Sequence, residues 1–315
     1  MSLAMIEVKD LVKNYGKHTA VDGINFRVRK GEIFGFLGPN GAGKTTTLNI
    51  LAGLSLPSSG VATIAGLDIT KHPIGCKKRL GIATQDANFD HHLNIKDNLY
   101  YQGLLYGLSR KELKIRVEAA LSWAKLGKYR KKHFHQLSGG MQRRLVVARA
   151  MLSDPEIILL DEPTTGLDPQ SRRQVWDYIK DLKEKGKTVL LTTHYMEEAD
   201  VLCDRISIID NGRIIACGTP DELKKVLNND IVIDIALDPA VVNVVNRHIE
   251  KDLRNISGVN YIKRSDNGIR IGVGDDAVIE QVLNSIITKY KISGINIIHP
   301  TLEDVFLHLT GREMR

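Results

Sequence analysis

The chain has 315 residues, of which 43% are hydrophobic and 26% charged, and its formal net charge at pH 7 is +7. This length fits one large domain or two moderate ones, and the composition is that of a globular protein. No apolar run approaches the ~20 residues that a membrane-spanning helix needs, and the N-terminal residues MSLAMIEVKD lack the apolar core of a signal peptide. We therefore expect a soluble, cytosolic protein.

Basic residues and cysteines are both spread along the sequence. Cys76, Cys203 and Cys217 are far apart and fit none of the usual metal-ligand spacings, so we expect reduced, structural thiols. The basic excess serves solubility, or it attracts nucleic acid or anionic lipid headgroups. Because only a modest basic cluster stands out, at residues 128–132, solubility is the simpler interpretation.

Short apolar stretches separated by turn residues occupy positions 5–37 and predict several strands. The last of them, residues 33–37, is uniformly apolar, as a buried strand would be. In the turn at 14–17, Tyr15 could offer the face of its ring to an adenine base. A lone tyrosine in a turn more often packs against its own chain, so both interpretations of Tyr15 stand at this point.

The stretch from 38 to 46 reads GPNGAGKTT and fits the phosphate-loop pattern G-x-x-x-x-G-K-[ST] between a predicted strand and a predicted helix. Glycines let backbone N–H groups turn inward around phosphate oxygens, and the following helix presents its positive end. Lysine adds a charge, and the threonine hydroxyl can ligate Mg²⁺. The sequence therefore predicts a nucleotide site at Gly38, Pro39, Asn40, Gly41, Ala42, Gly43, Lys44, Thr45 and Thr46.

Residues 93–152 carry apolar side chains at helical spacing, which predicts a helical insert. A short strand at 81–84, followed directly by Gln85, precedes it. The insert ends in LSGGMQRR, where Ser138 can cap a helix. A helix start with two glycines leaves backbone amides unobstructed for an anion, although a plain N-cap after a loop is the alternative.

Two adjacent acids follow a buried strand in the run EIILLDEP. Four consecutive apolar residues suit the centre of a parallel sheet and bring Asp161 and Glu162 to the carboxyl edge, where ligands bind in open α/β folds. One carboxylate can support Mg²⁺ and the other can polarise a water for attack on phosphorus. The next buried strand, 189–193, delivers His194 to the same edge, although a histidine there is often only a loop residue. Beyond it, the pair Asn211-Gly212 predicts a type I′ hairpin turn.

Residues 228–230 look like a domain boundary, so the predicted domains are 1–227 and 228–315. Beyond it, the apolar pattern predicts strand, helix, strand, strand, helix and strand, an order that is ferredoxin-like. The first of these helices carries Val241, Val244, Val245 and Ile249. Thr301 with Asp304 then caps a terminal helix. No chemistry is evident in this segment, and His91, His92, His133 and His135 have no partners at metal-ligand spacing.

With all motifs together, residues 1 to about 227 resemble the ATP-binding-cassette ATPases. GPNGAGKTT looks like the Walker A loop, IILLDEP like Walker B, and LSGGMQ like the signature of that family. Gln85, Asp168 in the run GLDP, and His194 fall at the family's Q-loop, D-loop and switch histidine. The resemblance implies an α/β P-loop NTPase with a RecA-like core, an antiparallel β subdomain and a helical subdomain.

The resemblance also implies roles in binding ATP and Mg²⁺. Lys44 would contact the β- and γ-phosphates, Thr45 and Gln85 would ligate Mg²⁺, and Asp161 would hold the water shell of the metal. Glu162 would be the general base, His194 would touch the γ-phosphate, and Tyr15 would stack on adenine. The residues after Gln85 follow the family pattern only loosely.

Completion of the site by a second copy is a further implication of the resemblance. The signature residues of one chain would reach the ATP held by the other; they are Ser138, Gly139, Gly140 and Gln142. ATP would then stabilise a closed dimer, and hydrolysis would release it.

The tail PTLEDVFLHLTGR, residues 300–312, resembles the C-terminal extension of ATPase subunits of the daunorubicin-resistance type. This implies an exporter subunit that forms a homodimer, or pairs with a related cassette. It would dock on separate permease subunits at the inner face of the membrane, without direct contact to nucleic acid. The rivals are a cassette protein acting on ribosomes or nucleic acid, whose relatives usually carry two cassettes or a long coiled-coil insert, and a regulatory nucleotide sensor.

Overall fold

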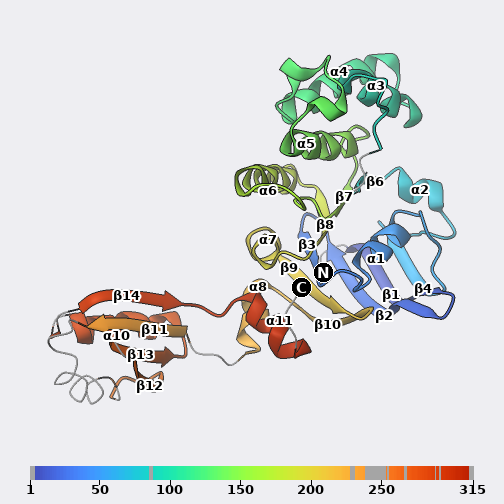
Figure 1. The fold of residues 1–315 in the computed structure, drawn as a ribbon. Coiled ribbons are helices and arrows are strands. Elements are labelled where there is room, and N and C mark those ends of the chain that lie inside the picture. Colours follow the sequence, from blue (N-terminus) through green and yellow to red (C-terminus); the bar gives the residue numbers. More distant parts are fainter. Residues whose placement is uncertain are drawn as a thin grey trace. The chain divides into compact units, whose positions relative to one another are not determined.

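The computed structural model describes residues 4–84, 88–227, 231–237, 253, 255–265, 268–287, 289–290 and 292–311. The chain forms two compact units, Met1–Pro220 with Leu309–Arg315, and Asp221–His308 (Figure 1). This division falls before the boundary expected at residue 227, and it groups the last residues with the first unit.

A six-stranded sheet with the order β10-β9-β3-β8-β7-β6 is the centre of the first unit. Its inner strands β3 (Ile33–Leu37), β8 (Thr188–Thr193) and β7 (Ile157–Asp161) pair in parallel and are buried along their whole length. Strands buried on both faces are largely apolar, as predicted, and the polar residues of β7 and β8 lie at the strand ends. β6 (Leu80–Ala83) forms one edge, and the antiparallel hairpin of β9 (Arg205–Asp210) and β10 (Arg213–Gly218) forms the other.

A second, antiparallel sheet has the order β2-β1-β4-β5, from β2 (His18–Arg29), β1 (Ala4–Tyr15), β4 (Ser59–Ile64) and β5 (Leu67–Asp68). One hydrophobic core joins both sheets and α1 (Lys44–Leu51). Its aromatic centre is Phe26 from β2, whose ring lies 5.7 Å from Phe34 and 4.8 Å from Phe36, both on β3. The two sheets are therefore held as one body around the start of α1.

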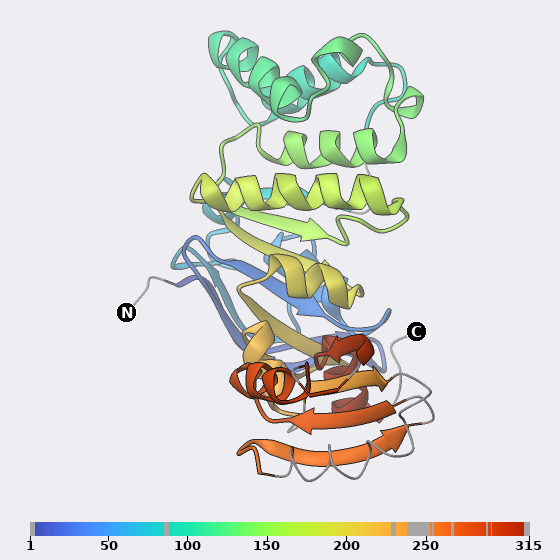
Figure 2. The same ribbon diagram turned by 90° about the vertical axis from the view of Figure 1, so that its left-hand side faces the viewer.

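Helices complete the first unit. α2 (Pro73–Lys77), α6 (Pro169–Glu184) and α7 (Met196–Leu202) connect the strands, while α3 (Ile95–Leu105), α4 (Arg110–Trp123) and α5 (Gly139–Ala150) form the helical insert that the spacing predicted. Short 3-10 turns lie at Gly127–Tyr129 and Phe134–Gln136. α5 and α6 run alongside each other, so the insert meets the rest of the unit there (Figure 2).

One turn and two helix caps have the conformation that their residues favour. Asn211 and Gly212 both have positive φ, 47° and 77°, as a type I′ turn requires. Ser109 and Glu112 form the capping box of α4. Ser138 caps α5, its hydroxyl accepting the backbone N–H of Met141 at 3.4 Å.

The second unit contains a four-stranded antiparallel sheet with the order β12-β13-β11-β14. Its strands are β11 (Ile231–Leu237), β12 (Val259–Ser265), β13 (Gly268–Val273) and β14 (Ile292–Ile298), with α10 (Asp276–Ile287) between the last two. This agrees with the ferredoxin-like prediction in the described part. The helix expected around Val241–Ile249 lies outside the described residues. α8 (Pro220–Lys225) precedes the sheet and α11 (Leu302–Thr310), with its predicted Thr301–Asp304 cap, follows it.

Paired positions on β11 and β14 give a test of the core of this sheet. Ile233 is fully buried, whereas its register partner Ile297 is 37% exposed. Ile233→Ala is expected to lower the local opening free energy by about 2–5 kcal/mol, because it leaves a cavity, and Ile297→Ala by less than about 1 kcal/mol. Hydrogen exchange of the β11 and β13 amides measures both; equal effects would contradict this packing.

Candidate active site

The loop after β3, residues 38–43, is shaped by contacts that only glycine allows. A Cβ on Gly38 would lie 2.1 Å from the Ile209 carbonyl oxygen, and one on Gly43 would lie 2.5 Å from that of Ala20. Gly43 also has φ +103°, a conformation that L side chains rarely adopt. The Gly212 N–H donates to the Ala42 carbonyl at 3.0 Å, so the β9–β10 turn holds the loop in place.

A pocket of about 240 Å³ opens beside this loop. The Tyr15 ring at its side is 50% exposed, with the Lys13 ammonium 4.9 Å from the ring centre. A tyrosine that packed against its own chain would be covered, so the ring is available for stacking. The lining residues are Tyr15, His18, Ala20, Asn40, Gly41, Gly43, Lys44, Thr45, Thr46 and Glu162, of which His18 and Ala20 had no sequence signal.

The Lys44 ammonium is the buried cation of the site, with 4% of the residue exposed. It donates to the carbonyls of Gly38 at 2.7 Å and Pro39 at 3.1 Å, and lies 3.4 Å from Glu162 Oε1. Burial lowers the pKa of Lys44, while Glu162 and Asp161 act in the opposite direction. The positive charge therefore lies directly over the loop, with a carboxylate as its counter-ion.

Asp161, at the end of β7, is buried and gathers hydroxyl groups. Its Oδ1 accepts the hydroxyls of Thr192 at 2.6 Å and Thr45 at 3.1 Å. Carboxylate and hydroxyl oxygens suit Mg²⁺, which is bound by few protein ligands together with phosphates and waters. Within the described ranges, no three His, Cys, Asp or Glu side chains gather as a metal site. Gln85, the other predicted metal ligand, lies outside the described residues.

Glu162 follows in an uncommon backbone conformation, with φ +45°. Its N–H donates to the Thr192 carbonyl at 3.1 Å, Thr165 Oγ1 donates to Oε2 at 3.0 Å, and His194 Nδ1 lies 3.3 Å from Oε1. Burial raises the pKa of Glu162, but Lys44, Thr165 and His194 together bring it below its usual value. The carboxylate is therefore ionised at neutral pH and held between Lys44 and His194.

The predicted signature residues lie elsewhere and do not line this pocket. Ser138 and Gly139 are exposed at the start of α5, and a Cβ on Gly140 would lie 2.7 Å from Ser171 Oγ on α6. The Gln142 amide donates to carbonyls of its own chain, those of Phe134 at 3.1 Å and Leu137 at 3.2 Å. It thus holds the approach to α5 rather than pointing outward.

Asp168 is exposed and caps α6, where its Oδ1 accepts the Ser171 N–H at 2.9 Å. Hydrogen bonds from Ser171 lower the pKa of Asp168. In sum, the structure brings Lys44, Thr45, Asp161, Glu162 and His194 together, and leaves Ser138, Gly139 and Asp168 at the surface.

Glu198 is a buried acid near the site that sequence reasoning missed. Its Oε1 accepts Thr164 Oγ1 at 2.7 Å and Trp176 Nε1 at 3.1 Å, while Oε2 has no hydrogen-bond partner among the described residues. Burial raises the pKa of Glu198. The residue thereby joins the segment after Glu162 to α6 and α7. The only signal for Glu198 in the sequence was its position four residues after His194, in the helix that follows.

The fold and the site are those of a P-loop nucleoside triphosphatase. The ABC transporter family model matches residues 21–165, and the ATP-binding protein DrrA1-3-like C-terminal domain matches residues 218–310. Nod factor export ATP-binding protein I of Ralstonia nicotianae is 40% identical over 318 residues, spanning 100% of this chain and 96% of that protein. The linearmycin resistance ATP-binding protein LnrL of Bacillus subtilis is 38% identical, spanning 99% of this chain and 100% of that protein.

A solved dimeric ATP-binding cassette in a post-hydrolysis state, bound to ADP and Pi, is similar at a TM-score of 0.62 and 28% identity. The match covers 68% of this chain and 98% of the chain in that structure. The chain belongs to the ATP-binding proteins of ABC transporters. It is an ATPase subunit, and these relatives do not support the rival of a cassette acting on ribosomes.

Replacing Glu198 by glutamine tests whether burial raises the pKa of this carboxyl group. Because its pKa is raised above 4.5 in the folded chain, the free energy of unfolding falls as pH rises from that value towards the folded pKa. Glu198→Gln keeps the acceptor for Thr164 and Trp176 but does not titrate. Its melting temperature relative to wild type is expected to be higher at pH 8 than at pH 5, by about 2–4 °C.

Glu197→Gln, at the exposed neighbouring acid, is the matched control and should show the same offset at both pH values. An equal effect of Glu198→Gln at pH 5 and pH 8 would mean that Glu198 is ionised in the folded chain.

Proposed function

We propose that this chain binds ATP with Mg²⁺ at the β3 loop and hydrolyses it between two copies, to drive export through separate membrane subunits. The position of Glu162 carries the proposal. An ionised carboxylate lies 3.4 Å from the Lys44 ammonium and 3.3 Å from His194, at the mouth of a loop built for phosphate. A general base must be ionised and lie close to the phosphate that the water attacks, and Glu162 meets both conditions.

Phosphate binding follows from the loop and Lys44. The bound triphosphate would replace Glu162 as the counter-ion of Lys44, and the loop N–H groups with the start of α1 would face the phosphate oxygens. Tyr15 would stack on the adenine ring. Thr45 and Asp161, with Gln85 as the expected third ligand, would hold Mg²⁺, which neutralises charge on the phosphates when bound.

Hydrolysis would use the carboxylate that phosphate binding releases. Glu162 accepts a proton from a water as its oxygen attacks the γ-phosphorus, and the bond to ADP breaks with the electron pair leaving on ADP. His194 on the same sheet edge orients the γ-phosphate. Thr192 and Thr165 hold Glu162 in place through their hydrogen bonds.

Completion of the site in trans rests on the exposed start of α5. Ser138 and Gly139 face solvent, with backbone amides at the positive end of a helix. In a dimer these groups would reach the γ-phosphate held by the other copy, as would Gly140. The Gln142 side chain, which is engaged within its own chain, would support this segment indirectly.

Glu162→Gln is expected to keep ATP affinity within about twofold, to lower turnover by about 10²-fold or more, and to trap a dimer in the presence of ATP. Lys44→Ala is expected to lose ATP binding and, with it, both dimer and turnover. ATP titration, phosphate release and light scattering measure the three quantities. If Glu162→Gln turned over at the wild-type rate, another group would be the base.

Docking on the membrane subunits would use an exposed apolar surface at the end of α3, here called the α3 surface. It consists of Tyr101, Leu104, Leu105 and Tyr106, and Leu105 is 82% exposed. Exposed clusters of large apolar side chains mark interaction sites. Behind this surface, Arg149 lies near Tyr106, stacks over Phe89 and donates to the Asn88 carbonyl.

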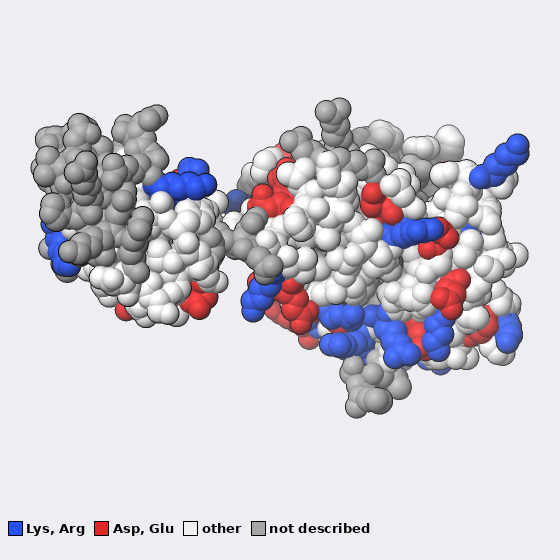
Figure 3. All heavy atoms as spheres, turned by 90° about the horizontal axis from the view of Figure 1, so that it is seen from below, with Lys and Arg blue, Asp and Glu red and all other residues white. Residues whose placement is uncertain are grey.

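The partner would be a cytosolic, apolar loop of a permease, which places the chain at the inner face of the membrane. In the ranges that the structure describes, no helix is long and apolar enough to cross a bilayer. Lys, Arg, Asp and Glu are interspersed on the face of the first unit shown in Figure 3. Such a mixed surface suits a protein partner better than nucleic acid.

Leu105→Asp is expected to lower recovery of the membrane partner by about tenfold without changing the ATPase rate of the free chain. The measurement is to tag the chain in its host, solubilise membranes in mild detergent and identify what co-purifies. Ile74→Asp, at a 72% exposed isoleucine on α2, is the matched control. Recovery of ribosomes alone by the wild-type chain would contradict the proposed partner.

A further inference from the structure

Arg143 on α5 makes three charge-assisted hydrogen bonds that no motif role accounts for. Its Nε donates to the Pro163 carbonyl at 2.7 Å, Nη1 to the Thr84 carbonyl at 2.8 Å, and Nη2 to the Asp161 carbonyl at 2.5 Å. Burial lowers the pKa of the guanidinium to about 10, so it remains charged at neutral pH. A planar group with five fixed donors suits such a three-point contact, whereas the single ammonium of lysine does not.

The three carbonyls belong to the backbone that carries the catalytic groups. Those of Asp161 and Pro163 flank Glu162, and Thr84 follows the end of β6 and precedes the predicted metal ligand Gln85 in the sequence. Arg143 lies on the same helix that begins at Ser138 and Gly139. One side chain therefore joins the start of α5 to the backbone on both sides of the proposed base.

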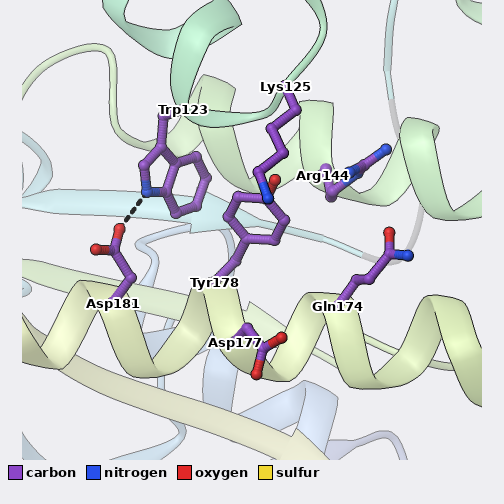
Figure 4. A pocket seen from close by; sticks show the side chains of 7 residues that line it. All are labelled: Trp123, Lys125, Arg144, Gln174, Asp177, Tyr178 and Asp181. Carbon is purple, nitrogen blue, oxygen red and sulfur yellow. Dashed lines mark hydrogen bonds between the residues drawn. The ribbon is translucent and has the colours of Figure 1, made fainter.

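Another contact between the helical insert and the rest of the unit borders an open pocket. A pocket of about 480 Å³ lies between α4, α5 and α6, with Trp123 bonded to Asp181 and the Arg144 guanidinium 5.7 Å from the Tyr178 ring (Figure 4). Tyr178 Oη and Arg144 Nε are buried there without hydrogen-bond partners in the described residues. The Arg143 guanidinium therefore has three partners at the sheet edge, whereas the Nε of the neighbouring Arg144 has none among the described residues.

We propose that Arg143 is a positioning residue that couples the orientation of the α5 start to the placement of Glu162 and of Thr84. This deepens the proposed function, on which it rests. When Ser138 and Gly139 engage the ATP of a second copy, the force on α5 reaches Glu162 through the Arg143 contacts. A chain without them would bind ATP normally, yet would dimerise and hydrolyse poorly.

The test compares Arg143→Lys and Arg143→Met with wild type in the full chain. ATP affinity is expected to stay within about twofold, because Lys44 and the loop are unchanged, while kcat falls by about 10- to 100-fold. In the Glu162→Gln background, the dissociation constant of the ATP-dependent dimer should rise by a similar factor. Hydrogen exchange of the segments around Thr84 and Glu162 should accelerate in both variants, which gives a readout independent of turnover. If Arg143→Met does not fold, Arg143→Lys alone decides.

Arg144→Met is the matched control, because it removes the neighbouring guanidinium from the same helix without touching the sheet edge. It should leave kcat and the dimer within about twofold of wild type. Wild-type kcat in Arg143→Lys and Arg143→Met, or equal losses of ATP affinity and kcat, would overturn the proposal. If the Glu162→Gln chain itself formed no dimer with ATP, the proposed function would fail, and kcat with hydrogen exchange would still judge Arg143.

Discussion

The buried charge of Lys44 is the constraint on which the rest of this structure depends. An ammonium group removed from water is strongly destabilising unless carbonyl dipoles or a carboxylate lie against it. Here the Gly38 and Pro39 carbonyls and Glu162 meet that need, which requires β3 and β7 to end at the same level. β8 lies between these two strands, so Thr192 at its end is placed to hold Asp161. The fully buried strands keep these charged groups within reach of one another.

Glu162 shows how the surrounding structure maintains a local strain. Its positive φ is unfavourable by about 1–3 kcal/mol and persists only when neighbours enforce it. Thr192 holds the amide on one side of the residue, and Arg143 holds the flanking carbonyls of Asp161 and Pro163. The carboxylate of the proposed base is therefore aimed by backbone contacts from β8 and α5.

The residues of the site that could be predicted are those whose position depends only on where a strand ends. Lys44, Asp161, Glu162 and His194 follow parallel strands, whose carboxyl ends necessarily meet at one edge. Apolar alternation likewise predicted where the strands of the second unit lie along the chain, although not which strands pair in the sheet. Arg143, Thr192 and Glu198 were not predictable, because each acts through a partner far away in sequence. Gln142 shows the converse: within the signature run it resembled an outward-facing group, yet its amide bonds the Phe134 and Leu137 carbonyls.

The charge arrangement gives a physical reason why binding of ATP would favour formation of a dimer. In this structure Lys44 and Glu162 neutralise each other inside one chain, and the start of α5 is exposed. A triphosphate takes over Lys44 and brings more negative charge than one loop neutralises, so the amides at Ser138 and Gly139 of a second copy become favourable partners. Cleavage and departure of the γ-phosphate remove that charge, and Lys44 can return to Glu162. In the proposed cycle, the same ion pair would oppose dimerisation before ATP binds and would favour separation after hydrolysis.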